Sequence, residues 1–225
     1  MQAEKPVIEL TADGSATLFL PGLNEHYHSV KGALAESLHV YIESALRRIE
    51  KPEISLLEVG FGTGLNTFLS CLEAARRHIA IHYTTLELFP LSCQEAEALH
   101  YPDSVSPQHA ALFRALHTAR WDTPEEITPY FTLYKRQEDL TCCTFDRLYD
   151  VIYFDAFAPE KQPELWEESI FRNLFEHTAA GGVLTTYCAK GEVRRRLQRA
   201  GFQVERLAGP PGGKREILRG SKPII

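Results

Sequence analysis

The chain has 225 residues, and its 30 acidic and 24 basic side chains give a formal net charge of −6 at pH 7. Hydrophobic residues make up 44% and charged residues 24%, which excludes a disordered, collagen-like or coiled-coil chain. Every apolar run is cut by a charge or a glycine before it reaches the roughly 18 residues that a membrane helix needs. We therefore expect a single globular domain without a membrane segment.

The N-terminus and the cysteines both indicate a reducing compartment. Residues 1–6 lack the basic-then-apolar pattern of an export signal. The five cysteines include no C-x-x-C pair, which argues against a disulfide framework and against a structural zinc site. We interpret the adjacent Cys142 and Cys143 as small buried apolar residues rather than redox partners. The expectation is a cytoplasmic protein that holds no metal.

Charge is unevenly distributed along the chain. From Lys190 to Ile225 there are ten basic and three acidic residues, so this segment carries +7 and the rest of the chain −13. A basic lobe on an acidic body is compatible with binding of a polyanion such as RNA. A solvated helix face followed by a polar tail explains the same charges. Charge alone leaves both interpretations open.

In chain order, the predicted elements begin with a hairpin and a helix. Apolar and polar residues alternate over residues 7–20 around Asp13-Gly14, which predicts a β-hairpin. A polar loop rich in His and Tyr follows over residues 21–31. Apolar residues at helical spacing then predict an amphipathic helix over residues 32–49. We predict that residues 1–50 form an extension packed on the main domain.

The main domain, residues 51–225, alternates strands and helices. The predicted strands are 54–59, 81–88, 130–136, 149–154, 183–187, 202–207 and 215–218, and the helices are 66–77, 90–99, 164–177 (ended by Gly181-Gly182) and 193–200. Strands separated by helices pair in parallel, whereas the last two, joined by a short loop, must pair antiparallel. This predicts an α/β, doubly wound, Rossmann-like fold with a mostly parallel seven-stranded sheet and one antiparallel strand. Residues 101–129 fit neither period and are interpreted as an insertion near the ligand edge.

The first strand runs into a glycine-rich turn with the sequence Glu-Val-Gly-Phe-Gly-Thr-Gly over residues 58–64. Gly60, Gly62 and Gly64 permit positive φ and let a ligand lie against the backbone. Their spacing differs from the G-x-G-x-x-G of dinucleotide sites, and the Gly-Lys-Ser/Thr of a phosphate loop is absent. Glu58 would repel a phosphate and attract a sulfonium or an ammonium. S-adenosylmethionine carries both cations and no phosphate, so we predict it as the ligand; a turn that binds nothing is the alternative.

Further candidate contacts to this ligand follow the turn and the next two strands. The turn itself contributes Phe61, Thr63 and Asn66. Glu87 ends the second strand at the distance from the glycines that is typical of acids binding ribose hydroxyls. Asp139, after the third strand, is a candidate acceptor for an adenine amino group or, equally, a helix N-cap.

The fourth strand ends in Asp155-Ala156-Phe157-Ala158-Pro159. This places the Asp155 carboxylate at the carboxyl edge of the sheet, where ligands of open α/β sheets bind. Methyltransferases that act on amino groups often have a similar polar-x-x-aromatic loop, whose polar oxygen accepts an N–H and aims the nitrogen lone pair. Asp155 would attract an ammonium and hold it as it loses its proton. An Asp155 that merely caps the next helix is the alternative.

Four segments together resemble a known methyltransferase family. They are Glu58–Asn66 (EVGFGTGLN), Glu87–Leu91 (ELFPL), Asp155–Trp166 (DAFAPEKQPELW) and Lys214–Glu216 (KRE). They are similar to the family that methylates 5-aminomethyl-2-thiouridine to 5-methylaminomethyl-2-thiouridine at the wobble position of tRNA. The resemblance runs from about residue 55 to residue 220, and the D-x-F-A-P-x-K-x-P-x-x-W string is more specific than the glycines.

The resemblance implies a class I methyltransferase fold, S-adenosylmethionine as cofactor and tRNA as partner. It implies that the Gly60–Gly64 turn, Glu87 and Asp139 bind the cofactor, and that Asp155 and its loop lie beside the target amine. In this interpretation we assign roles by residue type and placement. The nucleobase pocket would be shaped by Phe157, Pro159 and Trp166, and tRNA phosphates would be faced by Lys161, Lys190, Lys214 and Arg215.

Residues 26–33, His-Tyr-His-Ser-Val-Lys-Gly-Ala, also resemble a family element that closes over the cofactor. Tyr27 and Ser29 are therefore candidate cofactor contacts. Metal binding by His26 and His28 is the alternative, although no further ligands cluster with them in the sequence.

The bifunctional enzyme of this family carries a flavin-dependent oxidoreductase after the methyltransferase, and the present chain ends at Ile225. We therefore expect methyl transfer alone, with a separate enzyme supplying the aminomethyl intermediate. The sequence leaves open whether the substrate carries the 2-thio group. It also leaves open two other functions, methylation of a small-molecule or protein amine and RNA binding by a noncatalytic domain of this fold; a nicotinamide dehydrogenase is a more distant alternative.

Overall fold

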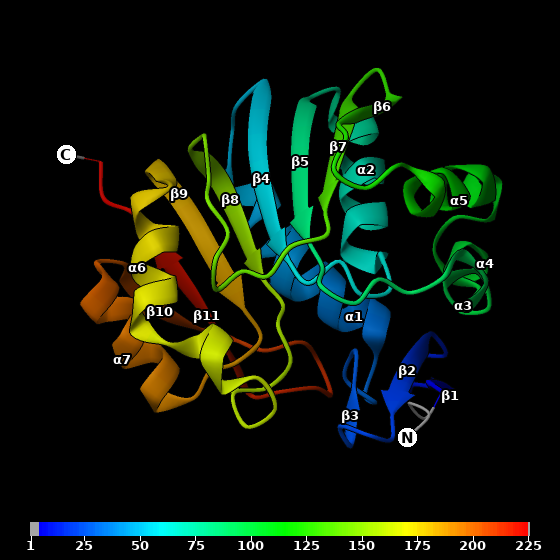
Figure 1. Cartoon of the computed structure of the whole chain (residues 1–225), viewed down its shortest axis with the longest axis horizontal. Helices are drawn as coiled ribbons and strands as arrows, with labels where there is room; N and C mark the ends of the chain where they lie inside the picture. The colour runs from blue at the N-terminus through cyan, green and yellow to red at the C-terminus, as the bar shows by residue number, and fades with distance from the viewer. Residues whose placement is uncertain (1–4, 225) are drawn as a thin grey trace.

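A computed structural model describes residues 5–224, and Figure 1 shows a central β-sheet with helices on both of its faces. The expectation about an export signal rests partly on residues 1–4, which lie outside the described residues. Across the sheet the strands follow the order β10-β11-β9-β8-β4-β5-β7-β6. Their bounds are β4 Glu53–Val59, β5 Ala80–Leu86, β6 Glu125–Thr128, β7 Phe131–Arg136, β8 Tyr149–Phe154, β9 Thr178–Thr186, β10 Gln203–Ala208 and β11 Glu216–Ser221.

The pairing of these strands confirms the predicted α/β, doubly wound class. β9, β8, β4, β5 and β7 pair in parallel, and β11 runs antiparallel to both β9 and β10. The sheet has eight strands rather than seven, because β6 adds an antiparallel edge strand beside β7. β6 has the sequence Glu-Glu-Ile-Thr and is only half buried, so it lacks the apolar alternation by which a strand is predicted.

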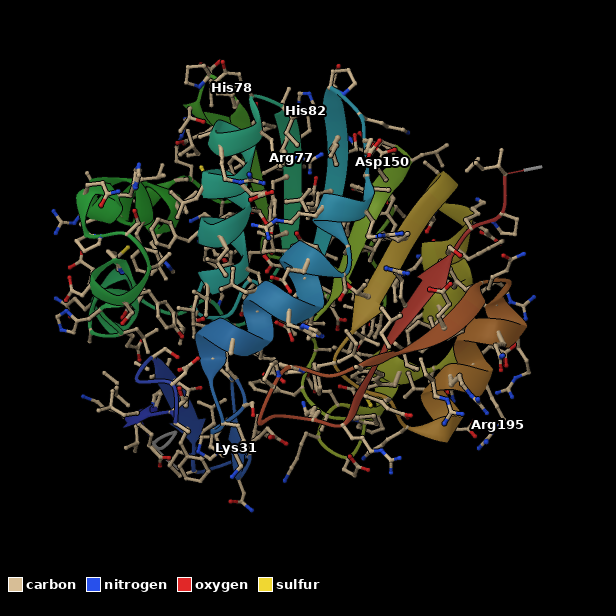
Figure 2. All side chains as sticks on the ribbon, turned by 180° about the vertical axis from the view of Figure 1, so that it is seen from behind. Lys31, Arg77, His78, His82, Asp150 and Arg195 are labelled. Atoms are coloured by element: carbon tan, nitrogen blue, oxygen red, sulfur yellow. The ribbon has the colours of Figure 1, made fainter. Side chains whose placement is uncertain are left out.

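The pleat of the sheet divides the core into two layers. In β4, Ile54 and Leu56 belong to the cluster beneath α1 (Ala33–Ser37) and α2 (Leu65–Arg77), whereas Leu57 and Val59 belong to the cluster beneath α6 (Glu168–Glu176) and α7 (Gly191–Ala200). Successive side chains of a strand point to opposite faces, so one apolar strand supplies both layers. Seen from behind, α1 and α2 cross the near face of the sheet (Figure 2).

Two of the predicted helices differ in the structure. The segment predicted as one helix over residues 32–49 is α1, followed by a π-helical turn η1 (Leu38–Glu43) and a 3₁₀ turn η2 (Leu46–Arg48). The wider turn buries three consecutive residues, Val40, Tyr41 and Ile42, which one face of a regular helix does not do. The predicted helix 90–99 shortens to α3 (Cys93–Glu97), which begins at a capping box formed by Ser92 and Glu95.

The helices on the other face agree more closely with their prediction. α7 ends at Gly201, whose φ of 116° and close contact with the Phe175 ring both favour glycine. The segment 164–177 splits into a 3₁₀ turn η4 (Pro163–Trp166) and α6. The predicted stop at Gly181-Gly182 is wrong, because the helix ends at Glu176 and those glycines lie within β9.

Residues 101–129 are regular rather than irregular. They form α4 (Tyr101–Val105), a 3₁₀ turn η3 (Pro107–His109), α5 (Ala110–Thr118) and β6. The Tyr101 hydroxyl donates to the Ala16 carbonyl at 2.9 Å, and the Phe113 ring packs edge-on against Phe68 of α2. These elements are short and stabilised by tertiary contacts, which explains why their periodicity is weak in the sequence.

The predicted N-terminal hairpin is confirmed. β1 (Val7–Leu10) pairs antiparallel with β2 (Ala16–Leu20), and β3 (Glu25–His26) adds a third short strand. Asp13 in the turn accepts hydrogen bonds from the Thr11 hydroxyl and the Ser15 backbone, as expected of an aspartate that stabilises a tight turn. Within residues 5–224, no helix combines the length and the apolar character needed to cross a membrane.

Candidate active site

The parallel strands end at a cavity of about 1220 Å³. Its walls come from the glycine turn after β4, the loops after β5 and β8, the segment around Tyr27 and the loop between β10 and β11. Sites for one drug-sized ligand typically measure roughly 300–1,000 Å³, so this cavity has room for a donor and an acceptor together. No residue of the segment 101–129 lines it, but His117 and Trp121 of that segment pack against Phe61 of the glycine turn, so the segment lies near the ligand edge behind the cavity wall. In Figure 2, Lys31 lies at the cavity end of the molecule and His78, His82 and Asp150 at the opposite end.

The glycine turn forms one wall of the cavity and is fixed on both sides. Gly60, Gly62 and Gly64 have φ values of 90°, 49° and 74°. A Cβ on Gly60 would lie 2.8 Å from the Asp155 carbonyl oxygen, and one on Gly62 would lie 3.0 Å from the Tyr27 ring. Side chains do not fit there, and the backbone is the surface that faces a ligand. Phe61, Thr63 and Asn66 also line the cavity, whereas Gly64 does not and lies against His117.

Glu87 and Asp139 lie on the same side of the cavity and bind their own loops. Both Glu87 carboxylate oxygens accept backbone N–H groups, from Gly62 at 3.0 Å and from Phe89 at 2.9 Å, so Glu87 fixes the glycine turn. Asp139 accepts from the backbone N–H and the hydroxyl of Thr141, both at 2.8 Å, which caps a turn rather than a helix. Each carboxylate lines the cavity with lone pairs to spare for a hydroxyl or an amino group.

Glu58 does not face the cavity, which corrects the expectation that it attracts the cation of the ligand. Its side chain is fully buried, and one carboxyl oxygen accepts from the hydroxyls of Thr67 and Thr85 at 3.0 and 2.8 Å. Burial raises the pKa of Glu58 to about 8. The group is therefore mainly neutral at pH 7 and stabilises the junction of β4, β5 and α2.

Asp155 follows β8 and lines the cavity with its carboxylate. The Tyr41 hydroxyl donates to one oxygen at 2.6 Å, and the Asn66 amide donates to the other at 2.7 Å. Burial raises the pKa of Asp155 to about 7, and the two donors oppose part of that rise. The helical turn that follows starts at Pro163, so the structure excludes the alternative in which Asp155 caps it.

The loop after Asp155 has two layers. Phe157 and Pro159 line the cavity, as predicted for residues that shape it. Trp166 is fully buried and does not line the cavity, which corrects its assignment to the nucleobase pocket. Its indole N–H instead donates to the Phe157 carbonyl at 2.8 Å, and the Tyr187 hydroxyl donates to the Ala156 carbonyl at 2.9 Å. Trp166 thus supports the wall from behind.

The segment after β3 covers the glycine turn. Tyr27 packs edge-on against the Phe157 ring at 5.1 Å, and both Tyr27 and Ser29 line the cavity. The rings of His26 and His28 have separate environments: His26 pairs with Glu9 at 3.0 Å, whereas burial lowers the pKa of His28 to about 4. Within the described residues, no group of three or more His, Cys, Asp or Glu side chains is placed to hold a metal ion.

Basic residues on α7 and basic residues at the cavity have different surroundings. The arginines of α7 lie on its outer face, where Arg195, Arg196 and Arg199 all pair with Glu192; Figure 2 shows Arg195 at an outer corner. This part agrees with the interpretation as a solvated helix face. The cations predicted to face tRNA instead gather at the cavity, where all four line its wall: Lys161, Lys190, Lys214 and Arg215.

Three residues that contact the site were not predicted as site residues: Glu36 and Tyr187 line the cavity, and Tyr41 lies behind it and donates to Asp155. Tyr41 occupies an apolar position of the amphipathic pattern, and nothing local distinguishes it from a core residue. Glu36, on the short α1, gives no signal because acids are common on helices. Tyr187 follows β9 directly, and the rule that pointed to Asp155 after β8 would have found it.

Known proteins are similar to this chain in sequence and in fold. A family model described as S-adenosyl-L-methionine-dependent methyltransferase matches residues 133–223. The tRNA 5-methylaminomethyl-2-thiouridine biosynthesis bifunctional protein MnmC of Azoarcus sp. is 32% identical over 209 residues, covering 86% of this chain and 32% of the relative. MnmC of Ectopseudomonas mendocina is 34% identical over 210 residues with the same coverage. The chain thus spans about a third of the length of these curated relatives.

The solved structures agree with this on the level of the fold. The crystal structure of MNMC2 from Aquifex aeolicus has a TM-score of 0.75 and 24% sequence identity, and the match covers 100% of this chain and 74% of that one. The resemblance seen in the four sequence segments agrees with relatives named MnmC that are about 30% identical over most of this chain. These similarities place the chain among the S-adenosyl-L-methionine-dependent methyltransferases of the MnmC type.

Proposed function

We propose that the protein methylates the amino group of 5-aminomethyluridine, with or without the 2-thio group, at the wobble position of tRNA. One observation carries the chemistry: the Asp155 carboxylate lies in the cavity next to the glycine turn, held by Tyr41 and Asn66. The choice of acceptor is supported by the names of the MnmC relatives, which refer to tRNA 5-methylaminomethyl-2-thiouridine biosynthesis.

The residues of the turn fit S-adenosylmethionine. Gly60 and Gly62 line the cavity without side chains of their own, so a ligand in the cavity can approach their backbone directly. The buried Asn66 carbonyl oxygen has no hydrogen-bond partner among residues 5–224 and is suited to accept from an ammonium. We propose that Glu87 binds the ribose hydroxyls and Asp139 the adenine amino group. When bound, this cofactor supplies a methyl group on a positively charged sulfur.

The acceptor requires a group that removes a proton. An aliphatic amine is protonated at neutral pH and has no free lone pair until it loses one proton. The Asp155 carboxylate can bind the ammonium, take that proton and orient the resulting lone pair. A carboxyl pKa of about 7 suits this task, because the group is then both substantially ionised and basic enough to accept a proton. Phe157 and Pro159 would enclose the uracil ring.

We further propose that Lys161, Lys190 and Arg215 contact phosphates of the anticodon arm, since they surround the cavity mouth. The same proposal includes three further points. The domain division lies at residue 50, and the protein acts in the cytoplasm, where tRNA is modified. A separate enzyme supplies the aminomethyl group. Both sequence-level alternatives, a small-molecule amine and a noncatalytic RNA-binding domain, predict different outcomes in the following experiment.

The test is methyl transfer from labelled S-adenosylmethionine to tRNA taken from a strain that lacks this gene, followed by nucleoside mass spectrometry. The expected product is 5-methylaminomethyluridine or its 2-thio form, formed at the expense of the aminomethyl nucleoside. The rate should fall steeply with salt concentration, because tRNA binding releases counterions. Absence of label in tRNA, or label in another nucleoside, contradicts the proposal. A salt-insensitive reaction with a small amine would favour the small-molecule alternative.

A further inference from the structure

The side chain of Lys214 lines the cavity and contacts two of its other wall residues. Its Nζ atom is 3.5 Å from the centroid of the Tyr187 ring and 3.2 Å from Oε1 of Glu36. A cation within about 6 Å of an aromatic centroid is attracted by the ring. Lys214 therefore occupies a small cation site with an aromatic face on one side and a carboxylate on the other.

Glu36 is built into this site and is not a mobile surface acid. Only 8% of its side chain is exposed, and its second oxygen accepts the Ser29 backbone N–H at 2.8 Å. Within residues 5–224, Lys214 is the one ion-pair partner that Glu36 has. A carboxylate this deeply buried requires a positive partner, so the site favours a cation whether or not Lys214 supplies it.

Tyr187 connects the cation site to the proposed reaction centre. Its hydroxyl donates to the carbonyl of Ala156, the residue after Asp155, and this bond fixes the ring beside the Asp155 loop. Glu36 and Lys214 are also near enough to Asp155 to affect the pKa of its carboxyl, in opposite directions. The ring face of Tyr187 and two carboxylates thus border one region of the cavity.

Lys214 is suited to leave the site. It directly follows the Gly209–Gly213 turn between β10 and β11, and 41% of its side chain is exposed. Its flexible four-carbon stem can carry the ammonium out into solvent without movement of the sheet. Glu36 and Tyr187, in contrast, are held by hydrogen bonds at their polar ends.

We propose that Glu36 and Tyr187 form the subsite that recognises the protonated aminomethyl group of the acceptor, and that Lys214 occupies this subsite until the acceptor displaces it. The inference rests on the proposed function, since it assigns the residues that select its amine. It also explains selectivity for a cationic acceptor: a neutral or anionic group in the same place would displace Lys214 and leave Glu36 without a positive partner. Lys214 then opposes substrate binding, whereas a phosphate-binding lysine would assist it.

The test is a binding measurement with free nucleosides, which carry no phosphate. The protein is saturated with S-adenosylhomocysteine, and calorimetry compares 5-aminomethyluridine with the neutral 5-hydroxymethyluridine. We expect Lys214→Ala to bind 5-aminomethyluridine about tenfold more tightly than the wild type does, in line with the free energy of a partly desolvated cation–aromatic and ion-pair contact. Affinity for 5-hydroxymethyluridine should change much less. Lys214→Arg, which keeps the cation, should behave like the wild type.

Two further variants separate this effect from a general change in charge. Arg195→Ala removes one positive charge from the outer face of α7 and should leave both nucleoside affinities unchanged. Lys214→Ala combined with Glu36→Gln should lose the gain, because the carboxylate that attracts the ammonium is gone. Equal or weaker binding of 5-aminomethyluridine to a folded Lys214→Ala variant, or a gain that persists in the double variant, overturns the inference.

The binding readout also distinguishes the inference from the proposed function. If the wild type fails to methylate tRNA but Lys214→Ala still gains affinity for the amine, the subsite stands and the tRNA proposal fails. If tRNA is methylated and the gain is absent, the subsite is refuted alone.

Discussion

Glu58 in β4 and Asp155 after β8 are acids at the same edge of two paired strands, with opposite surroundings. The strands are parallel neighbours, and Glu58 lies opposite Tyr153 in their register. Burial raises the pKa of both carboxyls, to about 8 for Glu58 and about 7 for Asp155. Yet Glu58 is enclosed by the hydroxyls of Thr67 and Thr85, whereas Asp155 lines the cavity.

The two acids have different surroundings because Glu58 lies within its strand, whereas Asp155 follows the last residue of its strand. Glu58 is within β4 and has the same parity as Ile54 and Leu56, so it points onto α2. Asp155 comes one residue after β8, at the carboxyl edge of the sheet, where its backbone N–H donates to the carbonyl of Val59, the last residue of β4, at 3.0 Å. An acid beyond the last strand residue is therefore the better functional candidate than one inside the strand.

The largest expected effect is at the glycine turn, between the two acids. Gly62→Val should abolish measurable cofactor binding, because valine strongly disfavours the φ of 49° and its Cβ would lie 3.0 Å from the Tyr27 ring. Calorimetry with S-adenosylhomocysteine measures the effect. Gly22→Val is the matched control, since a Cβ at Gly22 meets nothing within 4 Å. Normal affinity in Gly62→Val would mean that the cofactor does not lie on this turn.

Exchanging the two acids for their amides tests the comparison directly. Asp155→Asn should retain cofactor binding and lower the rate of methyl transfer about 1,000-fold, in the range of a lost general base. Glu58→Gln should retain most of the rate, because it resembles the neutral acid that is already present at pH 7. Initial rates with saturating cofactor are compared for the two variants. Similar losses in both would show that Glu58 and Asp155 do not differ in function.

A smaller effect is expected from Tyr41, which distinguishes the environment of Asp155 from that of Glu58. Tyr41→Phe removes the 2.6 Å hydrogen bond that stabilises the Asp155 carboxylate, so the pKa of Asp155 should rise. Methyl transfer requires the ionised form, and its rate therefore increases as the pH rises through this pKa. We expect the rising part of the pH–rate profile to shift to higher pH by about one unit, and the rate at pH 7 to fall severalfold. If the pH–rate profile is unchanged in Tyr41→Phe, the rise of the rate with pH reflects the ionisation of another group.

Much of the fold is predictable from the sequence because its signals are local. The alternating strands and helices, the glycine turn and the short loop between β10 and β11 each leave a pattern within a few residues. What the sequence does not predict depends on tertiary contacts. β6 is a strand because it pairs with the otherwise unpaired edge of β7. η1 adopts the wider π-helical turn and buries three consecutive side chains.

In the site, too, some residues are predictable from local sequence signals and others depend on tertiary contacts. Asp155, Glu87 and the turn follow from the rule that ligands lie beyond strand ends, and Asp155, Glu87 and residues 60–63 of the turn line the cavity. Glu36 and Tyr41 come from a helix more than a hundred residues earlier in the chain than Asp155, and only the fold brings them to it. Trp166 was assigned to the pocket because of its motif, but its fully buried ring packs at 4.9 Å from Phe154 and belongs to the core.

The last expected effect is on stability rather than on rate, and it isolates Glu58. In the unfolded chain Glu58 has an ordinary pKa near 4.5, against about 8 when folded. Between these values the unfolded chain binds fewer protons than the folded one, so the contribution of Glu58 to stability is lost as the pH rises from about 4.5 to about 8. Glu58→Gln cannot ionise and avoids this loss. Relative to the wild type it should gain on the order of 4 kcal/mol between pH 5 and pH 9, because each pH unit between the two pKa values changes the stability by about 1.4 kcal/mol.

Urea unfolding of the wild type and Glu58→Gln at both pH values measures this gain. Asp155 titrates in both proteins, so most of its own contribution cancels, and the remaining change reports Glu58 together with its charge coupling to Asp155. A difference that does not vary with pH would mean that Glu58 is ionised in the folded protein at neutral pH. The end of β4 would then hold a buried negative charge beside the cofactor turn, and the distinction between the two acids would rest on direction alone.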